Sequence, residues 1–340
     1  MPLIPLDSPS QVVQRAVRWI GVSSMIFGLA GCAVAPRGPA ATLADAGVSA
    51  TSSFGSDVRK TSDALEYADL SDSFTTTWER CTSAPKFCKA EVKSNANYEK
   101  RHKLAEAVLL RERALSALGG AYTALKQEAD YDAKADLAGA TKKAIGGVND
   151  FAGAIAAIGG AAPAAALISQ PITAVAGVIA GNFAEQAQRK RIVTASRQIG
   201  AATQRLRDAM TVEAYVFDSL AQYLEDNDRS TRAALLKARL ISNTAVLGPL
   251  AQRLGVALVD DTDARVDASP ALQQAVQATL IAQSRAQVAL TRQRYSTAIA
   301  ALDALISQHE NLEKTQTVSL DDVARLLAEL DASLKPTIAK

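Results

Sequence analysis

Long stretches without proline are the feature of this sequence that most constrains its fold. Two proline-free spans of 77 residues each cover 86–162 and 172–248, and a third of 65 residues covers 271–335. Because proline breaks the interior of a helix, such spans leave room for long helices. Within them, apolar residues recur at alternating spacings of three and four, which is typical of a helix that buries one face. We therefore expect an all-α fold.

The longest apolar stripe extends over 192–223 and keeps one helix face for nine turns. Glu213 occupies one position of this stripe, which predicts a polar or hydrated spot in the buried seam. An aromatic content of only 5% beside 48% apolar residues fits closely packed, Ala-rich helices. We expect an elongated antiparallel bundle that forms a single domain over 42–340. The expected helices are 42–69, 95–160, 171–226, 231–256, 271–314 and 319–334.

Local start signals support three of these helices. Ser230 is a candidate N-cap for the helix from residue 231, and Ser269 precedes Pro270 in the order that favours a helix start. Ser319 and Asp322 have the spacing of a capping box.

The N-terminal 31 residues have the pattern of an export signal. Arg15 and Arg18 form a short basic region, and an apolar run follows from Trp19 to Ala30. This run is shorter than the roughly 20 residues that a membrane-spanning helix needs. We expect residues 1–31 to be removed.

The apolar run ends in Leu29-Ala30-Gly31-Cys32, which resembles the lipobox of bacterial lipoproteins. That resemblance implies a diacylglyceryl group on the Cys32 thiol, cleavage before Cys32 and acylation of the new amino group. Several acyl chains anchor a protein stably in a membrane. Ala33 follows instead of the aspartate that retains such proteins in the inner membrane of enteric-type bacteria, so the resemblance favours the outer membrane. Residues 32–41 are expected to form a flexible tether.

The remaining two cysteines, Cys81 and Cys88, enclose six residues that include Pro85. In an oxidising compartment, this spacing favours a disulfide that closes a small loop between helices. A metal pair is the alternative, but no His or further Cys lies nearby to complete the site.

Residues 151–184 form the most unusual segment, because they contain no charged residue. Pro163 and Pro171 divide the segment into two apolar halves, each too short to span a bilayer alone. One interpretation is a helical hairpin buried in the bundle core, where Ala and Gly faces allow close helix packing. The other is a hairpin that inserts into a membrane. The bulky residues that would then meet lipid are Phe151, Ile155, Ile158, Ile172, Val175, Ile179 and Phe183.

Long helices that carry an apolar hairpin resemble the α-helical pore-forming toxins of the cytolysin A type. The resemblance is one of architecture alone, since no sequence motif matches. A permanent lipid anchor departs from that family, whose members are generally released as soluble proteins.

Residue types that carry chemistry are scarce. His102 and His309 have no second His or Cys at metal-ligand spacing, so we expect each on a solvated helix face. The acidic stretch 260–267 lacks the Gly and Glu of a calcium-binding loop and is interpreted as a solvated interhelical loop. No nucleophile or phosphate-binding motif is present. The sequence predicts neither a metal site nor a cofactor, and no enzymatic activity.

The charge balance argues against nucleic acid as a partner. The chain has 37 basic and 35 acidic residues, and the basic run 189–191 is short. We expect a lipoprotein anchored in the outer membrane through Cys32, facing the periplasm, with exposure at the cell surface left open. It would act as a non-enzymatic structural or interaction module that binds another envelope protein. The alternatives are a membrane-active protein that inserts the 151–184 hairpin, and a periplasmic immunity or inhibitor lipoprotein.

Overall fold

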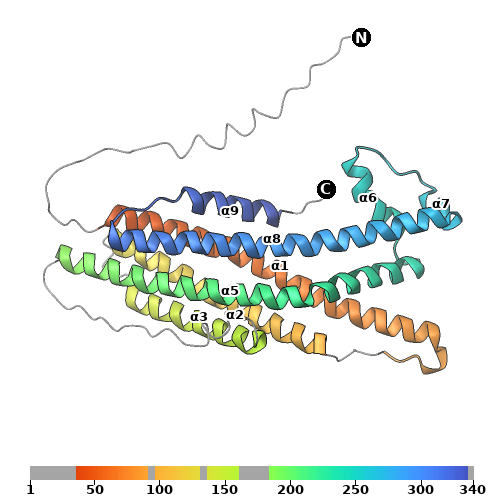
Figure 1. Cartoon of the computed structure of the whole chain (residues 1–340), viewed down its shortest axis with the longest axis horizontal. Helices are drawn as coiled ribbons and strands as arrows, with labels where there is room; N and C mark the ends of the chain where they lie inside the picture. Colours follow the sequence, from red (N-terminus) through yellow and green to blue (C-terminus); the bar gives the residue numbers. More distant parts are fainter. Residues whose placement is uncertain (1–35, 91–95, 131–135, 161–183, 336–340) are drawn as a thin grey trace, which may run out of the picture. The chain divides into compact units, whose positions relative to one another are not determined.

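The computed structural model describes residues 36–90, 96–130, 136–160 and 184–335. Over these ranges the chain forms eight α-helices and one 3-10 turn, with no strand, which confirms the predicted all-α bundle (Figure 1). The longest helix has 54 residues and therefore extends about 80 Å. The helices are α1 (Arg37–Ser83), α2 (Ala96–Ala129), α3 (Leu137–Gly159), α5 (Ala184–Lys237), α6 (Asn243–Arg253), α7 (Thr262–Ala268), α8 (Pro270–Lys314) and α9 (Asp321–Leu334).

The neighbouring helices α1 and α2 run antiparallel. Lys126, near the end of α2, pairs with Asp45 near the start of α1, and Arg101 at the start of α2 pairs with Asp69 farther along α1. α2 also packs along α3, and α5 packs along α8. The stripe on α5 faces the core as predicted, since Ile192, Ile199, Leu206, Val216 and Leu220 are all buried.

Three predicted boundaries in the first half of the chain are wrong. The predicted helix 95–160 is instead two helices, α2 and α3, which pack side by side. Asp136 caps the start of α3, where its side chain accepts a hydrogen bond from the Gly139 backbone nitrogen. α1 begins at Arg37, so 37–41 are helical rather than tether, and Ala40 is buried. α1 also continues to Ser83, and within this extension the Thr75 and Thr82 hydroxyls donate to carbonyls one turn back.

The second half differs in three ways. α5 continues through the predicted break at 227–230, so Ser230 caps no helix. Asn227 and Thr231 instead form hydrogen bonds with α1. α6 starts at residue 243, where Ser242 caps the Ala245 nitrogen. Ser269 caps α8 as predicted. α9 begins at Asp321 without a side-chain cap, so the Ser319 capping box is wrong: the Ser319 nitrogen donates to Gln308.

A charged cluster crosses the core at the position of Glu213. The Arg111 guanidinium lies 2.9 Å from Glu213 and 3.4 Å from Asp57, and the Tyr295 hydroxyl donates to the second Glu213 oxygen at 3.0 Å. All four side chains are buried. Burial raises the pKa of Glu213, while the charge of Arg111 and the Tyr295 hydrogen bond oppose this shift. The predicted polar spot in the seam is therefore an ion pair.

A neutral cluster lies farther along the core, and it shows that the predicted solvation of His309 is wrong. His309 is only 2% exposed. Its Nε2 lies 2.9 Å from the Tyr122 hydroxyl and its Nδ1 lies 2.9 Å from the Ser196 hydroxyl. Gly200 makes this approach possible, since an added Cβ there would lie 2.9 Å from the Cβ of His309. Burial lowers the pKa of His309 to about 3, so the ring is neutral at pH 7.

Candidate functional site

A cleft of about 970 Å³ opens between α1, α5, α6 and α8. Its volume lies at the upper end of the range for ligand pockets, which are typically apolar with a few polar groups. α1 contributes one helix face, whose residues follow each other at spacings of three and one. These residues are Lys60, Asp63, Ala64, Tyr67, Ala68 and Ser71.

The floor of the cleft combines apolar and polar side chains that are nearly buried. Phe217 of α5 and Val288 of α8 provide the apolar part. Ser71, Asn227 and Ser284 provide the polar part, from α1, α5 and α8. Two of these polar groups are already bound, because Asn227 donates to the Ala68 carbonyl at 2.9 Å and Ser284 donates to Asp228 at 2.6 Å. These hydrogen bonds hold the Asn227 and Ser284 side chains of the floor in place.

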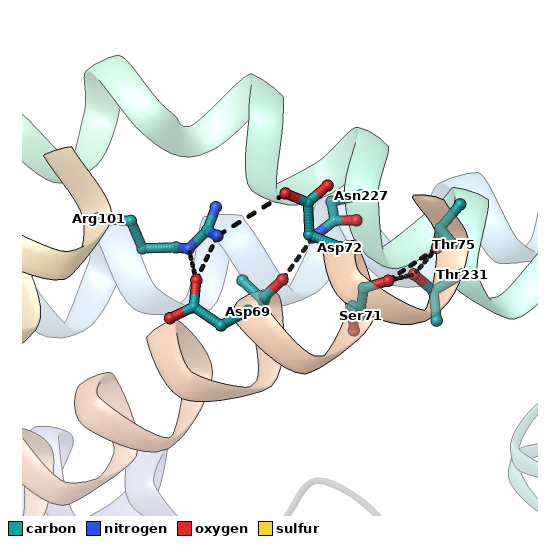
Figure 2. A network of polar contacts seen from close by, with 8 residues as sticks. Asp69, Ser71, Asp72, Thr75, Arg101, Asn227 and Thr231 are labelled. Atoms are coloured by element: carbon teal, nitrogen blue, oxygen red, sulfur yellow. Dashed lines mark hydrogen bonds and ion pairs between the residues drawn. The ribbon is translucent and has the colours of Figure 1, made fainter. Parts of the chain in front are cut away.

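Ser71 differs from its neighbours, because its hydroxyl has no hydrogen-bond partner within the described residues although the side chain is buried. The Ser71 carbonyl accepts hydrogen bonds from Thr75 and Thr231, and the hydroxyl points away from both threonines (Figure 2). A buried polar group without a partner costs free energy. An occupant of the cleft that reaches Ser71 can supply that partner.

Behind the cleft, a polar network joins α1, α2 and α5 (Figure 2). Arg101 is fully buried and binds Asp69, with Asp72 at 4.0 Å. Its guanidinium carbon lies 5.6 Å from the Tyr98 ring centre and 5.3 Å from that of Tyr223, which places the cation between two aromatic faces. This network fixes the α1 face that lines the cleft.

Three of the charged side chains that line the cleft have no ion-pair partner among the described residues, and they include both signs of charge. Lys60, Asp63 and Arg253 form no ion pair over the ranges that the structure describes. Asp228, by contrast, is occupied by Arg232 at 3.1 Å and by Ser284. The three available charges can pair with a bound molecule.

The predicted disulfide is confirmed. Cys81 and Cys88 are bonded, with their Cα atoms 4.4 Å apart, and the short helical turn Pro85–Phe87 lies between them. Cys32 and the predicted signal 1–31 lie outside the described residues, so the lipidation of Cys32 stays a prediction.

The predicted hairpin is only partly described. Phe151 and Ile155 are fully buried in the core, and Ile158 packs partly buried against it. Over 151–159 this agrees with the buried interpretation. The other four predicted lipid-facing residues, Ile172, Val175, Ile179 and Phe183, lie outside the described residues. Among the helices that are described, none is both long and apolar enough to cross a membrane.

The remaining predictions concern metal ligands. His102 is exposed as expected and lies beside Glu106. The acidic stretch is not an open loop, because Thr262–Ala268 form α7, where Asp263 accepts a hydrogen bond from the first backbone nitrogen of α6 and Asp261 pairs with Arg265. In the described part of the chain, no three His, Cys, Asp or Glu side chains gather as a metal site would require.

Sequence reasoning missed the cleft and its polar network. A signal was present, since Leu220, Leu224, Asn227 and Thr231 continue the apolar stripe of α5 at spacings of four, three and four. Asn227 and Thr231 are polar, so the apolar pattern alone ends before them, although both residues are buried against α1. No family model, curated protein or solved structure matches this chain.

Proposed function

We propose that this chain is a lipid-anchored, non-enzymatic interaction protein of the bacterial outer membrane, and that it binds another envelope protein through the cleft between α1, α5, α6 and α8. The cleft is the observation that carries the proposal. It offers an apolar floor, a buried hydroxyl without a partner and three charges that are free for a bound molecule. The lipobox at Leu29–Cys32 supplies the anchor.

The burial of Phe151 and Ile155 leads us to prefer this function over membrane insertion of the 151–184 hairpin. Exposing these side chains to lipid would remove two bulky groups from the core. Each large apolar side chain taken out of a core costs several kcal/mol.

Anchoring is tested by replacing Cys32 with serine in the full chain. We expect Cys32→Ser to abolish incorporation of labelled palmitate and to move the protein from the membrane fraction to the soluble fraction. The matched control is Cys81→Ser with Cys88→Ser, which removes the disulfide but leaves the anchor. If the Cys32→Ser protein still fractionates with membranes as the parent does, the anchored function is wrong.

A further inference from the structure

α9 occupies one end of a groove between α1 and α8. It packs on both helices, and it is fixed to α8 at each end. The Ser319 nitrogen, just before α9, donates to the Gln308 side chain at 2.8 Å, and Arg294 donates to the Ser333 carbonyl, near the end of α9, at 3.0 Å. α9 therefore covers α8 from Gln308 back to Arg294 (Figure 1).

α9 fills this end of the groove with a single apolar stripe. Val323, Leu327 and Leu330 follow at spacings of four and three and are buried in the main core. The opposite face carries charged residues such as Arg325 and Glu329, which remain exposed and pair with each other. α9 is thus an amphipathic helix with one apolar stripe.

The cleft lies next along the same two helices, and α5 and α6 complete its lining. On α8 it is lined from Thr291 to Gln283, starting one turn beyond the Arg294 that ends the α9 site. On α1 it is lined from Lys60 to Ser71. The same two helices therefore border a stretch that α9 fills and a stretch that no described residue of the chain fills.

We propose that an amphipathic helix of a partner protein docks in this cleft, in line with α9 and against the same two helices. This inference rests on the proposed interaction function and specifies the partner's chemistry. A helix that lays its apolar stripe in a groove is a common mode of peptide recognition. The lining of α1 from Lys60 to Ser71 spans about 17 Å, which corresponds to about three turns of the docked helix.

The lining defines which side chains the docked helix needs. Its apolar stripe would cover Phe217 and Val288 on the floor. A polar group near one end would bind the Ser71 hydroxyl, and charges beside the stripe would pair with Lys60, Asp63 or Arg253. Charges of both signs on the lining favour a helix with mixed charges, as on the outer face of α9.

The experiment uses two exposed alanines on α8, one turn apart. Ala286 lines the cleft and Ala289 does not. Each is replaced in turn by the photo-crosslinking residue p-benzoylphenylalanine in the full chain, in cells that make the protein, and the attached peptide is identified by mass spectrometry. We expect position 286, but not 289, to attach to a segment of another protein with apolar residues at spacings of three and four.

The second step uses a fluorescently labelled synthetic peptide with the sequence of the attached segment. Its affinity for the purified chain is measured by anisotropy, and circular dichroism reports whether it becomes helical on binding. We expect Ala286→Trp, which fills the cleft from an exposed position, to weaken binding by about tenfold or more. Ala289→Trp should change the affinity by less than about twofold, because it adds the same side chain outside the cleft.

The inference is overturned if position 286 yields no adduct, if 286 and 289 yield the same adducts, or if 286 attaches only to a second copy of this chain or to a small molecule. A peptide that binds without becoming helical also overturns it. These outcomes are independent of the Cys32→Ser result: a chain that is not anchored but binds a helical peptide at Ala286 contradicts the proposed function alone.

Discussion

Two polar clusters cross the core of this bundle, and the cost of burying their polar groups is offset differently in each. The cluster around Arg111 keeps its charges and balances them, with Glu213 and Asp57 on either side of the guanidinium. The cluster around His309 has no charge, because burial lowers the pKa of the imidazole to about 3. The first depends on pairing, since a buried charge without a partner is very costly. The second depends on hydrogen bonds alone.

The neutral cluster has a defined direction of donation. Thr203 donates to the Ile199 carbonyl and therefore accepts from the Tyr122 hydroxyl. Tyr122 in turn accepts from Nε2 of His309, whose Nδ1 accepts from Ser196. If this direction is disturbed, the imidazole can change its tautomer and the Ser196 hydroxyl can rotate to accept. The charged cluster has no such freedom, so we expect it to be the more sensitive of the two.

The largest effect is expected from Arg111→Met, which leaves Asp57 and Glu213 buried without their countercharge. Breaking a buried pair from one side costs about 3–5 kcal/mol of unfolding free energy. Urea denaturation at pH 7 measures the loss. Adding Glu213→Gln and Asp57→Asn should recover part of it, because the uncompensated charges are then removed. A loss below about 1 kcal/mol for Arg111→Met would show that the cluster is hydrated rather than dry.

Acid should act on the neutral cluster. The pKa of His309 is about 3 in the folded chain, against an ordinary value of 6.5. Between these two pH values, His309 is protonated in the unfolded chain and neutral in the folded chain. Stability is therefore complete above pH 6.5 and falls as the pH drops towards 3, by about 1.4 kcal/mol per pH unit.

Unfolding free energies measured between pH 7 and 4 test this expectation. His309→Gln should remove this part of the slope, because an amide does not titrate. His102→Gln, at an exposed position, should keep it. Equal slopes for the parent and His309→Gln would contradict the assignment.

A matched pair of tyrosines compares the two clusters directly. Tyr295→Phe removes a hydrogen bond to the buried Glu213 carboxylate, and we expect a loss of about 2–3 kcal/mol. Tyr122→Phe removes hydrogen bonds between neutral groups, and the cluster can rearrange, so about 1 kcal/mol is expected. Thermal and urea unfolding of both variants would measure the difference. The reverse order of the two losses would be incompatible with the proposed difference in sensitivity.

The sequence predicts the helices well where buried positions are apolar. The stripe of α5 and the cap of α8 are as expected, and Glu213 marks the charged cluster because it interrupts an apolar series. His309 is misread from its polar neighbours, although Leu305 and Leu312 place it on the buried stripe at spacings of four and three. A polar residue at a stripe position can be buried when a partner from another helix meets it, and a single sequence does not show that partner.

The cleft could not be predicted for a related reason. It depends on how α1, α5, α6 and α8 pack together, which is set by contacts between residues distant in the sequence, such as Asn227 with the Ala68 carbonyl. The sequence does not reveal the break between α2 and α3, because the apolar spacing continues on both sides and the start of α3 depends on the single cap Asp136.

α5 contributes to every polar cluster described above. Ser196 and Thr203 bind the neutral cluster, Glu213 binds Arg111, and Asn227 and Thr231 bind α1 beside the cleft. A purely apolar stripe of Ala, Leu and Ile would tolerate sliding of this helix by one turn, about 5.4 Å, with only modest repacking. The polar contacts do not tolerate it, because a slip would separate all of them at once. They therefore fix a single axial register for α5, in the way that a buried polar residue fixes the register of a coiled coil.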